Sequence, residues 1–457
     1  MYLMLHVLII IYCVTECCLA VRSPSAQFGR LLLFAGLGLI HGVAPAMVQP
    51  EYLPLLFSSY SDDIRTEAAF YALFGIILFG FGWRMYESRR VLPTTLSPAL
   101  TAWVYSPSTQ YKLRRLFWIC CVLGVVSWIG MALSTGASLS DFLRATRFTY
   151  RSAEGEYTRA MLGHVLVLAC IPGFTGFFLP RRYKIAGTLY ALGMAVFLYY
   201  AEKGSRMPTM GLLGSPLMGY ALTHRLQPRR LMYVALAGIA LIMLSVSMYN
   251  IRWVMMRSSV KDMLYMTVSK DTYQDALSRD PLNYHQYLLS SIYSFPREHP
   301  YLNGATYQRI LFFLLPRQYF PLLKPQDTCQ VFADVVHPSS ELGAHMVPPS
   351  LLGDCYINFW GWPGIAMMSC YGVLFGFVWW KIRTRHIWLF FMGPYFIRFT
   401  LLLLRGQPYQ SIVYSVTSFL MVWILMKILG CAKQAQAELV ALPVAQELTP
   451  STNILMK

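Results

Sequence analysis

The chain has little charge, and few of its residues are acidic. Of its 457 residues 13% are charged, and 21 Asp and Glu stand against 38 Lys and Arg. Soluble proteins carry roughly 25% charged residues, so this composition excludes one large soluble globule. It also excludes a disordered chain, because 56% of the residues are hydrophobic and 15% are aromatic. In a soluble protein a net charge of +17 indicates binding to nucleic acid, whereas in a membrane protein it reflects the orientation of the chain in the membrane.

Several catalytic and metal-binding patterns are absent from the sequence. No CxxC pair occurs among the ten cysteines, which argues against a structural zinc site. The sequence also has no HExxH, no nucleophile elbow, no Walker loop and no DxD pattern. It therefore gives no support for a protease, an ATPase or a metal–nucleotide glycosyltransferase, and we expect neither a metal nor a cofactor.

Long apolar stretches dominate the sequence. A transmembrane helix needs about 20 mostly apolar residues, and a helix satisfies its own backbone in hydrocarbon. Eleven stretches meet this requirement: about 2–21, 31–49, 67–83, 116–134, 161–180, 185–201, 208–223, 231–250, 356–380, 387–404 and 411–430. The sequence therefore predicts an all-α polytopic membrane protein with about eleven transmembrane helices.

The basic residues alternate along the chain and predict its orientation. Connections after the first, third, fifth, seventh and ninth stretches are basic, whereas the others are acidic or mixed. Short loops rich in Lys and Arg face the cytoplasm, so we expect the N-terminus outside and the C-terminus inside. The first stretch lacks the basic n-region of a cleavable signal peptide and is interpreted as retained. Almost all the excess positive charge then lies on the cytoplasmic side, so nucleic acid is not expected as a partner.

The predicted organisation has four parts, and one of them is a large outer loop. They are 1–250, with eight transmembrane helices and a smaller outer loop at about 135–160; 251–355, the large outer loop; 356–430, with three transmembrane helices; and 431–457, a cytoplasmic tail. A loop of this length is uncommon without a function. Its segment 310–315 is apolar but too short to span a membrane, so we interpret it as an interfacial or re-entrant helix.

Arginines gather at the predicted outer ends of the stretches. Arg398 lies inside the tenth stretch and Arg405 ends it, seven residues later, so both lie along one stripe of a helix. Lys203 and Arg206 follow the sixth stretch, and Arg317 lies in the large loop. Arginine holds phosphate through its bidentate fork, so together these residues favour a basic pocket for a diphosphate reached from the membrane. Taken singly, each is also explained as an interfacial anchor, a snorkelling residue or half of a buried ion pair.

The large loop also offers groups for acid–base chemistry. Glu341 and His345 are four residues apart, so they are neighbours if that stretch is helical, and Asp354 precedes the ninth stretch. A carboxylate or an imidazole at the site is a candidate general base. The alternatives are a hydrogen-bonded loop histidine and, for Asp354, a helix cap or an interfacial acid.

Further outer residues are candidates for binding a polymer and for a disulfide. Arg144 and Arg151 in the smaller outer loop are candidates for guiding an anionic polymer, with a solvated face as the alternative, and Tyr409, between the tenth and the last stretch, is a further candidate for binding. Cys329 and Cys355 are the cysteines that lie clearly in an outer loop. We predict that they form a disulfide in an oxidising periplasm.

Several short motifs, in this order, resemble the Wzy-type O-antigen and exopolysaccharide repeat-unit polymerases of bacterial inner membranes. The motifs are Lys203-Gly-Ser-Arg206; Leu315-Pro-Arg317 with Lys324-Pro325; Pro348-Pro-Ser-Leu-Leu-Gly-Asp354 followed by Tyr356, Asn358, Phe359, Gly361 and Gly364; and an arginine before a late outer loop. The sequence has Asp354 where these proteins often have Glu, and Trp360 separates Phe359 from Gly361. The resemblance implies a GT-C-like fold, an undecaprenyl-diphosphate-linked substrate, and glycan transfer at the periplasmic face of the inner membrane without nucleotide sugar or metal.

On this interpretation Arg206 and Arg405 hold the diphosphate, Arg398 or Arg317 supports them, and His345 or Glu341 is the base. The expected partners are the lipid-linked oligosaccharide, the bilayer, and a chain-length regulator and flippase of the same pathway. Two other functions stay open. One is an O-antigen ligase with similar chemistry, and the other is a polysaccharide flippase or exporter, although the sequence shows no repeat of the kind that marks many transporters.

Overall fold

The computed structural model describes most of the chain. It covers residues 1–22, 27–47, 60–87, 96–133, 162–163, 165–201, 206–224, 284–312, 320, 322–323, 325–336, 347–383 and 390–429. At residues 27, 99, 132, 199–201 and 206–208 it describes the backbone alone.

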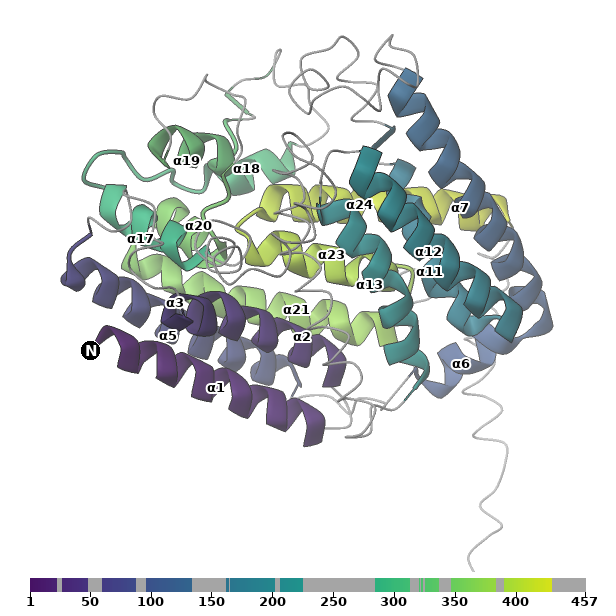
Figure 1. The fold of residues 1–457 in the computed structure, drawn as a ribbon, viewed down its shortest axis with the longest axis horizontal. Helices are drawn as coiled ribbons and strands as arrows, with labels where there is room; N and C mark the ends of the chain where they lie inside the picture. Colours follow the sequence, from purple (N-terminus) through teal and green to yellow (C-terminus); the bar gives the residue numbers. More distant parts are fainter. Residues whose placement is uncertain are drawn as a thin grey trace, which may run out of the picture.

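Helices make up the fold, and no strand occurs among the described residues (Figure 1). In the first half of the chain they are α1 (Tyr2–Arg22), α2 (Gln27–Gly38), η1 (Leu39–Val43), α3 (Ala44–Met47), α5 (Asp62–Glu87), α6 (Pro98–Tyr105), α7 (Pro107–Leu133), η3 (Val167–Ala169), α11 (Cys170–Thr175), η4 (Gly176–Phe178), α12 (Arg181–Ala201) and α13 (Arg206–Thr223). In the second half they are α17 (Tyr284–Ser294), α18 (Ala305–Leu311), α19 (Thr328–Val336), α20 (Leu351–Asn358), η5 (Trp362–Ala366), α21 (Met367–Arg383), α23 (Gly393–Leu404) and α24 (Pro408–Ile428). The all-α prediction is confirmed for this part of the chain.

Among the described residues, six helical segments are long and apolar enough to cross a membrane. They are Tyr2–Arg22, Phe28–Met47, Asp62–Glu87, Pro107–Met131, Trp362–Arg383 and Pro408–Ile428. Each overlaps one of the predicted stretches. Two shorter apolar helices, Val167–Phe178 and Gly393–Leu404, overlap the stretches 161–180 and 387–404, and α12 and α13 overlap the stretches 185–201 and 208–223. The stretch 231–250 lies outside the described residues.

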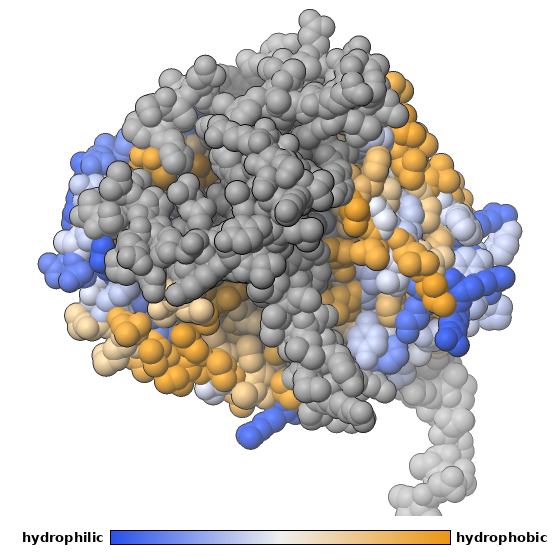
Figure 2. Space-filling model, in the orientation of Figure 1, coloured by the Kyte–Doolittle hydropathy of each residue, from blue (hydrophilic) through white to orange (hydrophobic). Residues whose placement is uncertain are grey.

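Apolar side chains cover the outer flanks of these helices. In Figure 2, hydrophobic residues form broad areas over the regions of α1 and of α7. On α1, Leu3 and Ile11 are 60% and 56% exposed, and on α7, Trp118 and Val122 are 57% and 58% exposed. Water-facing helices carry polar residues on such faces, and large exposed apolar areas mark contact with a membrane or a partner. Together with the lengths of the helices, this surface supports a membrane-embedded protein.

Glycines let α5 and α21 pack with their backbones in contact. A Cβ atom on Gly82 of α5 would lie 2.1 Å from the carbonyl oxygen of Ser369, and one on Gly372 of α21 would lie 2.1 Å from that of Phe79. Small residues at a helix crossing allow this close approach, which is typical of membrane helices. Phe79 and Phe375 then meet edge to face with ring centroids 5.7 Å apart, in the core between the two helices.

Replacing Gly372 by alanine is expected to lower the stability by about 1–3 kcal/mol, because the added methyl group forces the backbones of α5 and α21 apart. Thermal unfolding of the purified protein in detergent measures the effect. Gly193→Ala on α12 is the matched control, since nothing lies within 4 Å of a Cβ atom there. Equal unfolding temperatures for the two variants would contradict the close packing.

The helix ends gather into two groups at opposite ends of the bundle. One end, which we call the loop end, contains η1, α17 and the starts of α1, α5 and α21. There Tyr60 donates to the Ser290 hydroxyl (3.1 Å), and Trp362 donates to Glu67 (3.0 Å). At the other end, Arg30 of α2 pairs with a glutamate of α1 and one of α5. The sequence predicts that the helix ends of each group lie on the same side of the membrane. The contacts in the structure are between helix ends of the same group.

The predicted stretch 356–380 is not one helix. α20 ends at Asn358, Gly361 takes a positive φ of 75°, and Pro363 lies in the first turn of η5. A glycine in the left-handed region followed by a proline ends one helix and begins another. The apolar segment therefore begins at Trp362, and Asp354 lies in a separate short helix before it.

The interfacial helix predicted at 310–315 is described only in part. α18 ends at Leu311, and residues 313–319 lie outside the described ranges. The helix that is described begins earlier than predicted, after Gly304, which has a positive φ of 79°. Leu311 is 78% exposed at its end, as an interfacial side chain would be.

Candidate functional site

Six of the thirteen predicted site residues have described side chains. Those residues are Asp354, Arg398, Arg405, Tyr409, Cys329 and Cys355. The predictions for Lys203, Arg144, Arg151, Arg317, Glu341 and His345 fall outside the described ranges. Arg206 begins α13, where the backbone alone is described.

The turn between α23 and α24 is pressed against the start of α20. The backbone N–H of Ser350 donates to the carbonyl oxygen of Arg405 at 3.0 Å. Gly406 has a positive φ of 79°, and a Cβ atom there would lie 2.2 Å from the Ser350 carbonyl oxygen, so only glycine fits. Ser350 itself has a φ of 72°, which is rare for a residue with a side chain. Strained backbone of this kind clusters at functional sites.

This contact places Arg405 close to Asp354. Ser350 caps α20 by accepting a hydrogen bond from Gly353 through its side chain, and its carbonyl oxygen accepts one from the N–H of Asp354 (2.9 Å). Ser350, whose N–H is bonded to Arg405, therefore lies one helical turn before Asp354. The turn of α23 and the cap of α20 together hold a guanidinium-bearing residue and a carboxylate-bearing residue at the loop end.

Asp354 is fully buried in a network of polar side chains. The Tyr307 hydroxyl of α18 donates to Asp354 Oδ2 at 2.9 Å, and the Tyr371 hydroxyl of α21 lies 2.5 Å from that of Tyr307. Asn358, one turn further along α20, donates to Asp354 Oδ1 at 3.1 Å and to the Thr328 hydroxyl at 3.2 Å. Because a phenol proton bound to a carboxylate cannot also go to Tyr371, Tyr371 donates to Tyr307.

The surroundings of Asp354 hold its carboxyl group near its titration point at neutral pH. Burial raises the pKa of Asp354 from 3.8 to about 7, the hydrogen bond from Tyr307 opposes the rise, and the buried Asp327 adds to it. The same burial raises the pKa of Tyr307 well above 10, so the phenol keeps its proton. A carboxyl group with a pKa close to the working pH is suited to general base catalysis.

The predicted disulfide is not formed in the structure. Cys329 and Cys355 are both buried free thiols. The thiol of Cys329 faces the carbonyl oxygen of Gly406 at 3.6 Å, whereas Cys355 belongs to α20, where its thiol acts electrostatically on Tyr71. Burial raises the pKa of the Cys329 thiol well above 9, and Asp354 and Arg405 both act on it. Cys329 is therefore an uncharged thiol in contact with the turn that follows Arg405.

Three arginines near the loop end each lie over a tyrosine ring. The Arg405 guanidinium carbon lies 5.5 Å from the ring centre of Tyr284, and that of Arg309 lies 4.5 Å from the ring of Tyr409. Arg309 also donates to the carbonyl oxygen of Pro325 at 3.0 Å. A ring face holds a guanidinium group without neutralising it. The predicted binding residue Tyr409 is thus packed against an arginine of α18.

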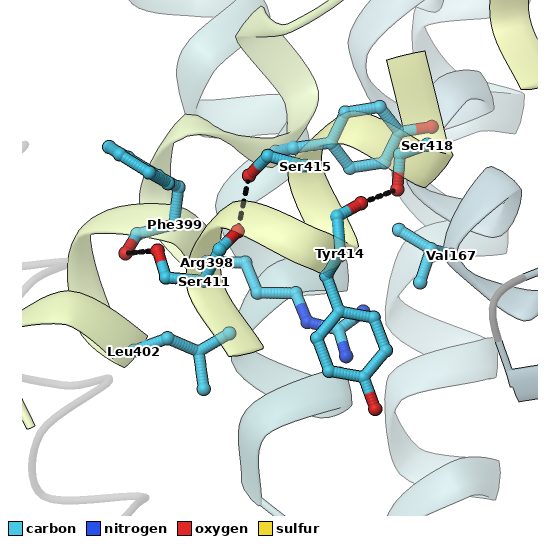
Figure 3. A pocket seen from close by; sticks show the side chains of 9 residues that line it. Val167, Arg398, Phe399, Leu402, Ser411, Tyr414, Ser415 and Ser418 are labelled. Carbon is cyan, nitrogen blue, oxygen red and sulfur yellow. Dashed lines mark hydrogen bonds between the residues drawn. The ribbon is translucent and has the colours of Figure 1, made fainter. Parts of the chain in front are cut away.

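The third arginine, Arg398, lines a small, partly open pocket between α23, α24 and η3. Figure 3 shows its side chain beside the ring of Tyr414, with a distance of 4.5 Å from the guanidinium carbon to the ring centre. Ser411 and Ser415 of α24 also line the pocket, and each donates to a backbone carbonyl group. Arg398 takes part in no ion pair among the described residues, and its Nε atom is buried there without a hydrogen-bond partner.

Glycines of α13 make room for Arg398 and place the start of that helix at the loop end. A Cβ atom on Gly211 would lie 3.3 Å from the Arg398 side chain, and one on Gly214 would lie 2.9 Å from that of Ile397. Leu222, near the end of α13, lies beside the start of α23. The two helices are therefore antiparallel, so Arg206 begins α13 at the end where α23 reaches Arg405.

Sequence reasoning missed the partners of Asp354 and a second buried polar cluster. Tyr307 and Tyr371 are 47 and 17 residues from Asp354, and tyrosines are frequent in this chain, so nothing in their spacing marks them. The second cluster consists of His6, His41 and His285, all fully buried at the loop end. A histidine inside each of two apolar stretches was the available signal, because a polar residue at such a position usually has a function.

The described residues contain no group of three or more His, Cys, Asp or Glu side chains arranged to hold a metal ion. No protein-family model, no curated protein and no solved structure matches the chain. Any inference about the function of the protein therefore rests on the geometry of the site and on the short motifs of the sequence.

Proposed function

We propose that the protein polymerises undecaprenyl-diphosphate-linked oligosaccharide repeat units at the periplasmic face of the bacterial inner membrane. The growing glycan is transferred as a block to the next lipid-linked unit. The order of the short motifs supports this family, and the apolar helices suit a lipid-linked substrate. The loop end then faces the periplasm, in agreement with the alternation of basic connections.

The observation that carries the proposal is the backbone contact at the loop end that joins Arg405 to Ser350, one helical turn before the buried Asp354. Transfer requires the acceptor hydroxyl oxygen to bond to the anomeric carbon while the bond from that carbon to the diphosphate breaks. The electron pair leaves with the diphosphate, so a cation must stabilise the charge that develops there. Arg405 supplies the cation, and Arg398 offers a second one in the apolar part of the bundle.

The base is assigned to Asp354 in preference to Glu341 and His345. Its pKa of about 7 leaves a substantial part of the carboxyl group ionised at neutral pH. Asp354 is fully buried and its Oδ2 atom is bonded to the Tyr307 hydroxyl, so in this mechanism the acceptor hydroxyl exchanges its proton with the carboxylate through Tyr307. The hydroxyl proton passes to the Tyr307 oxygen as the phenol proton passes to Asp354, which leaves Tyr307 unchanged.

A reconstituted assay tests the proposed function. The purified protein in liposomes is given lipid-linked repeat units from a strain that lacks it, and is expected to produce a ladder of longer lipid-linked glycans. Arg405→Ala should lower the rate by about 10²–10³-fold, because one preorganised donor to the developing charge is lost. Arg65→Ala is the control, since Arg65 also lies at the loop end but pairs with the exposed Asp62.

Other products would point to another function. A ligase transfers one glycan to a lipid-core acceptor and gives no ladder. A flippase moves the lipid-linked unit across the bilayer without forming a new glycosidic bond. Either result with wild-type protein would reject the polymerase.

A further inference from the structure

Three histidines from distant parts of the chain meet in the protein interior at the loop end. His6 comes from α1, His41 from η1 and His285 from α17, and all three are fully buried. The ring centres of His6 and His285 are 4.7 Å apart, and those of His41 and His285 are 5.6 Å apart. The cluster therefore joins α17, from the large loop, to the first two apolar segments of the bundle.

The hydrogen bonds of the cluster suit neutral imidazoles. His6 donates from Nδ1 to the carbonyl oxygen of His41 at 2.7 Å, which leaves its Nε2 atom without a proton. The Nδ1 atoms of His41 and His285 are 3.3 Å apart, so one ring donates to the other. The Nε2 atoms of all three rings are buried without a hydrogen-bond partner in the described part of the chain. An added proton on any ring would have no acceptor there.

Among the described residues, no carboxylate pairs with the cluster or acts on the pKa of its histidines. Tyr2 of α1 packs edge to face on His6 at 4.3 Å, and Arg65 of α5 acts on Tyr2. Burial lowers the pKa of His285 well below 6.5, and the two neighbouring histidines lower it further, because a proton on one ring disfavours a proton on another. On the adjoining α20 the acid is Asp354, which is bonded to Tyr307. Protonation therefore places an unpaired cation in an apolar interior, which is costly.

We propose that the three histidines form an acid-sensitive latch, which holds α17 against the bundle at neutral pH and releases it when the loop end is acidified. The residue before His285 is Tyr284, whose ring lies under Arg405. Release of α17 withdraws that ring from the arginine. The latch thus links the pH at the loop end to the geometry of the candidate site, and it does not depend on which reaction the site performs.

The latch has a definite pH dependence. Each histidine is neutral in the closed state and has a pKa near 6.5 once it is released into solvent. Proton uptake therefore favours the open state as the pH falls below 6.5. Between pH 7 and pH 5, each histidine that becomes solvated increases the open population about 25-fold. Tyrosine and arginine side chains near the cluster do not titrate in this range.

Hydrogen–deuterium exchange of the full-length protein in detergent tests the latch. After correction for the intrinsic exchange rate, protection of α17 amides is expected to fall at least 25-fold from pH 7 to pH 5. Protection of α23, which carries no histidine, should change little. Unchanged protection of α17 in the wild-type protein would overturn the proposal, whether or not any variant folds.

Substitutions identify the groups responsible. His285→Leu removes one titrating ring and should reduce the pH-dependent loss of protection by about 10-fold or more. His299→Gln is the matched control, because His299 lies just after α17 but outside the cluster, where its ring packs on Phe295 at 5.7 Å. A full pH response in a folded His285→Leu protein would also overturn the latch.

Discussion

Asp354→Asn is expected to lower the rate of polymerisation by about 10²–10⁴-fold, the usual contribution of a positioned general base. Asparagine keeps the shape of the side chain and the hydrogen bond from Tyr307, but it cannot take up the proton of the acceptor hydroxyl. Because Asp354 is fully buried and Asp327 opposes its negative charge, the substitution also removes the desolvation cost of that charge and its repulsion by Asp327. The fold should therefore survive, and the loss should appear in kcat in the liposome assay.

The pH profile of the wild-type rate should report the same carboxyl group. Base catalysis needs the ionised form, and the pKa of Asp354 is about 7, so the rate should rise with pH and reach half its plateau near pH 7. In Asp354→Asn the residual rate should not show this rise. A variant that keeps both the wild-type rate and the midpoint near 7 would exclude Asp354 as the base.

Asp327→Asn provides a matched control for that experiment. Asp327 is buried and its negative charge raises the pKa of Asp354. Its Oδ1 atom accepts a hydrogen bond from the N–H of Cys329 at 2.9 Å, which an asparagine oxygen also accepts. The plateau rate should remain and the midpoint should move below 7. The two substitutions thus separate a group that takes up the proton from a neighbour that only changes the local potential.

Much of the helical fold could be predicted from the sequence, because uninterrupted apolar stretches of about 20 residues leave few alternatives in a membrane. The stretch 356–380 was predicted wrongly, since hydropathy alone continues through Gly361 and Pro363, although these two residues end one helix and begin the next. Arg405 was expected to end the helix that carries Arg398, and it is the C-cap of α23. The sequence did not predict that its carbonyl oxygen accepts a hydrogen bond from Ser350 at the start of α20.

The candidate site was less predictable than the fold. Asp354 was among the candidates because it is one of the ionisable residues of the large loop that could act as a base, but its partners come from α18 and α21. The packing of α18 against α20 determines which tyrosine reaches the carboxylate. That packing cannot be predicted from a single sequence. The histidine cluster has the same origin, since His285 meets His6 and His41 only after α17 folds back on the bundle.

At the opposite end of the bundle, Glu16→Ala is expected to lower the free energy of unfolding by about 3–5 kcal/mol. Glu16 is fully buried in α1, and its carboxylate binds Arg30 of α2 and Arg84 of α5. Arg30 is itself buried, and when Glu16 is removed its one remaining acidic partner among the described residues is Glu87, at 3.3 Å. Breaking a buried ion pair leaves a charge in an apolar medium, and that desolvation cost dominates the effect.

Unfolding of the purified variant in detergent, followed by helical circular dichroism, measures this loss. Asp62→Asn is the control, because Asp62 is highly exposed and its pair with Arg65 at 3.6 Å is an ordinary surface contact of little weight. The double variant Glu16→Leu with Arg30→Met should recover much of the stability, since two packed apolar side chains often replace a buried ion pair at no cost. A Glu16→Ala protein as stable as Asp62→Asn would show that the charges at this end are solvated, and would remove the argument that they fix α1 to α2 and α5.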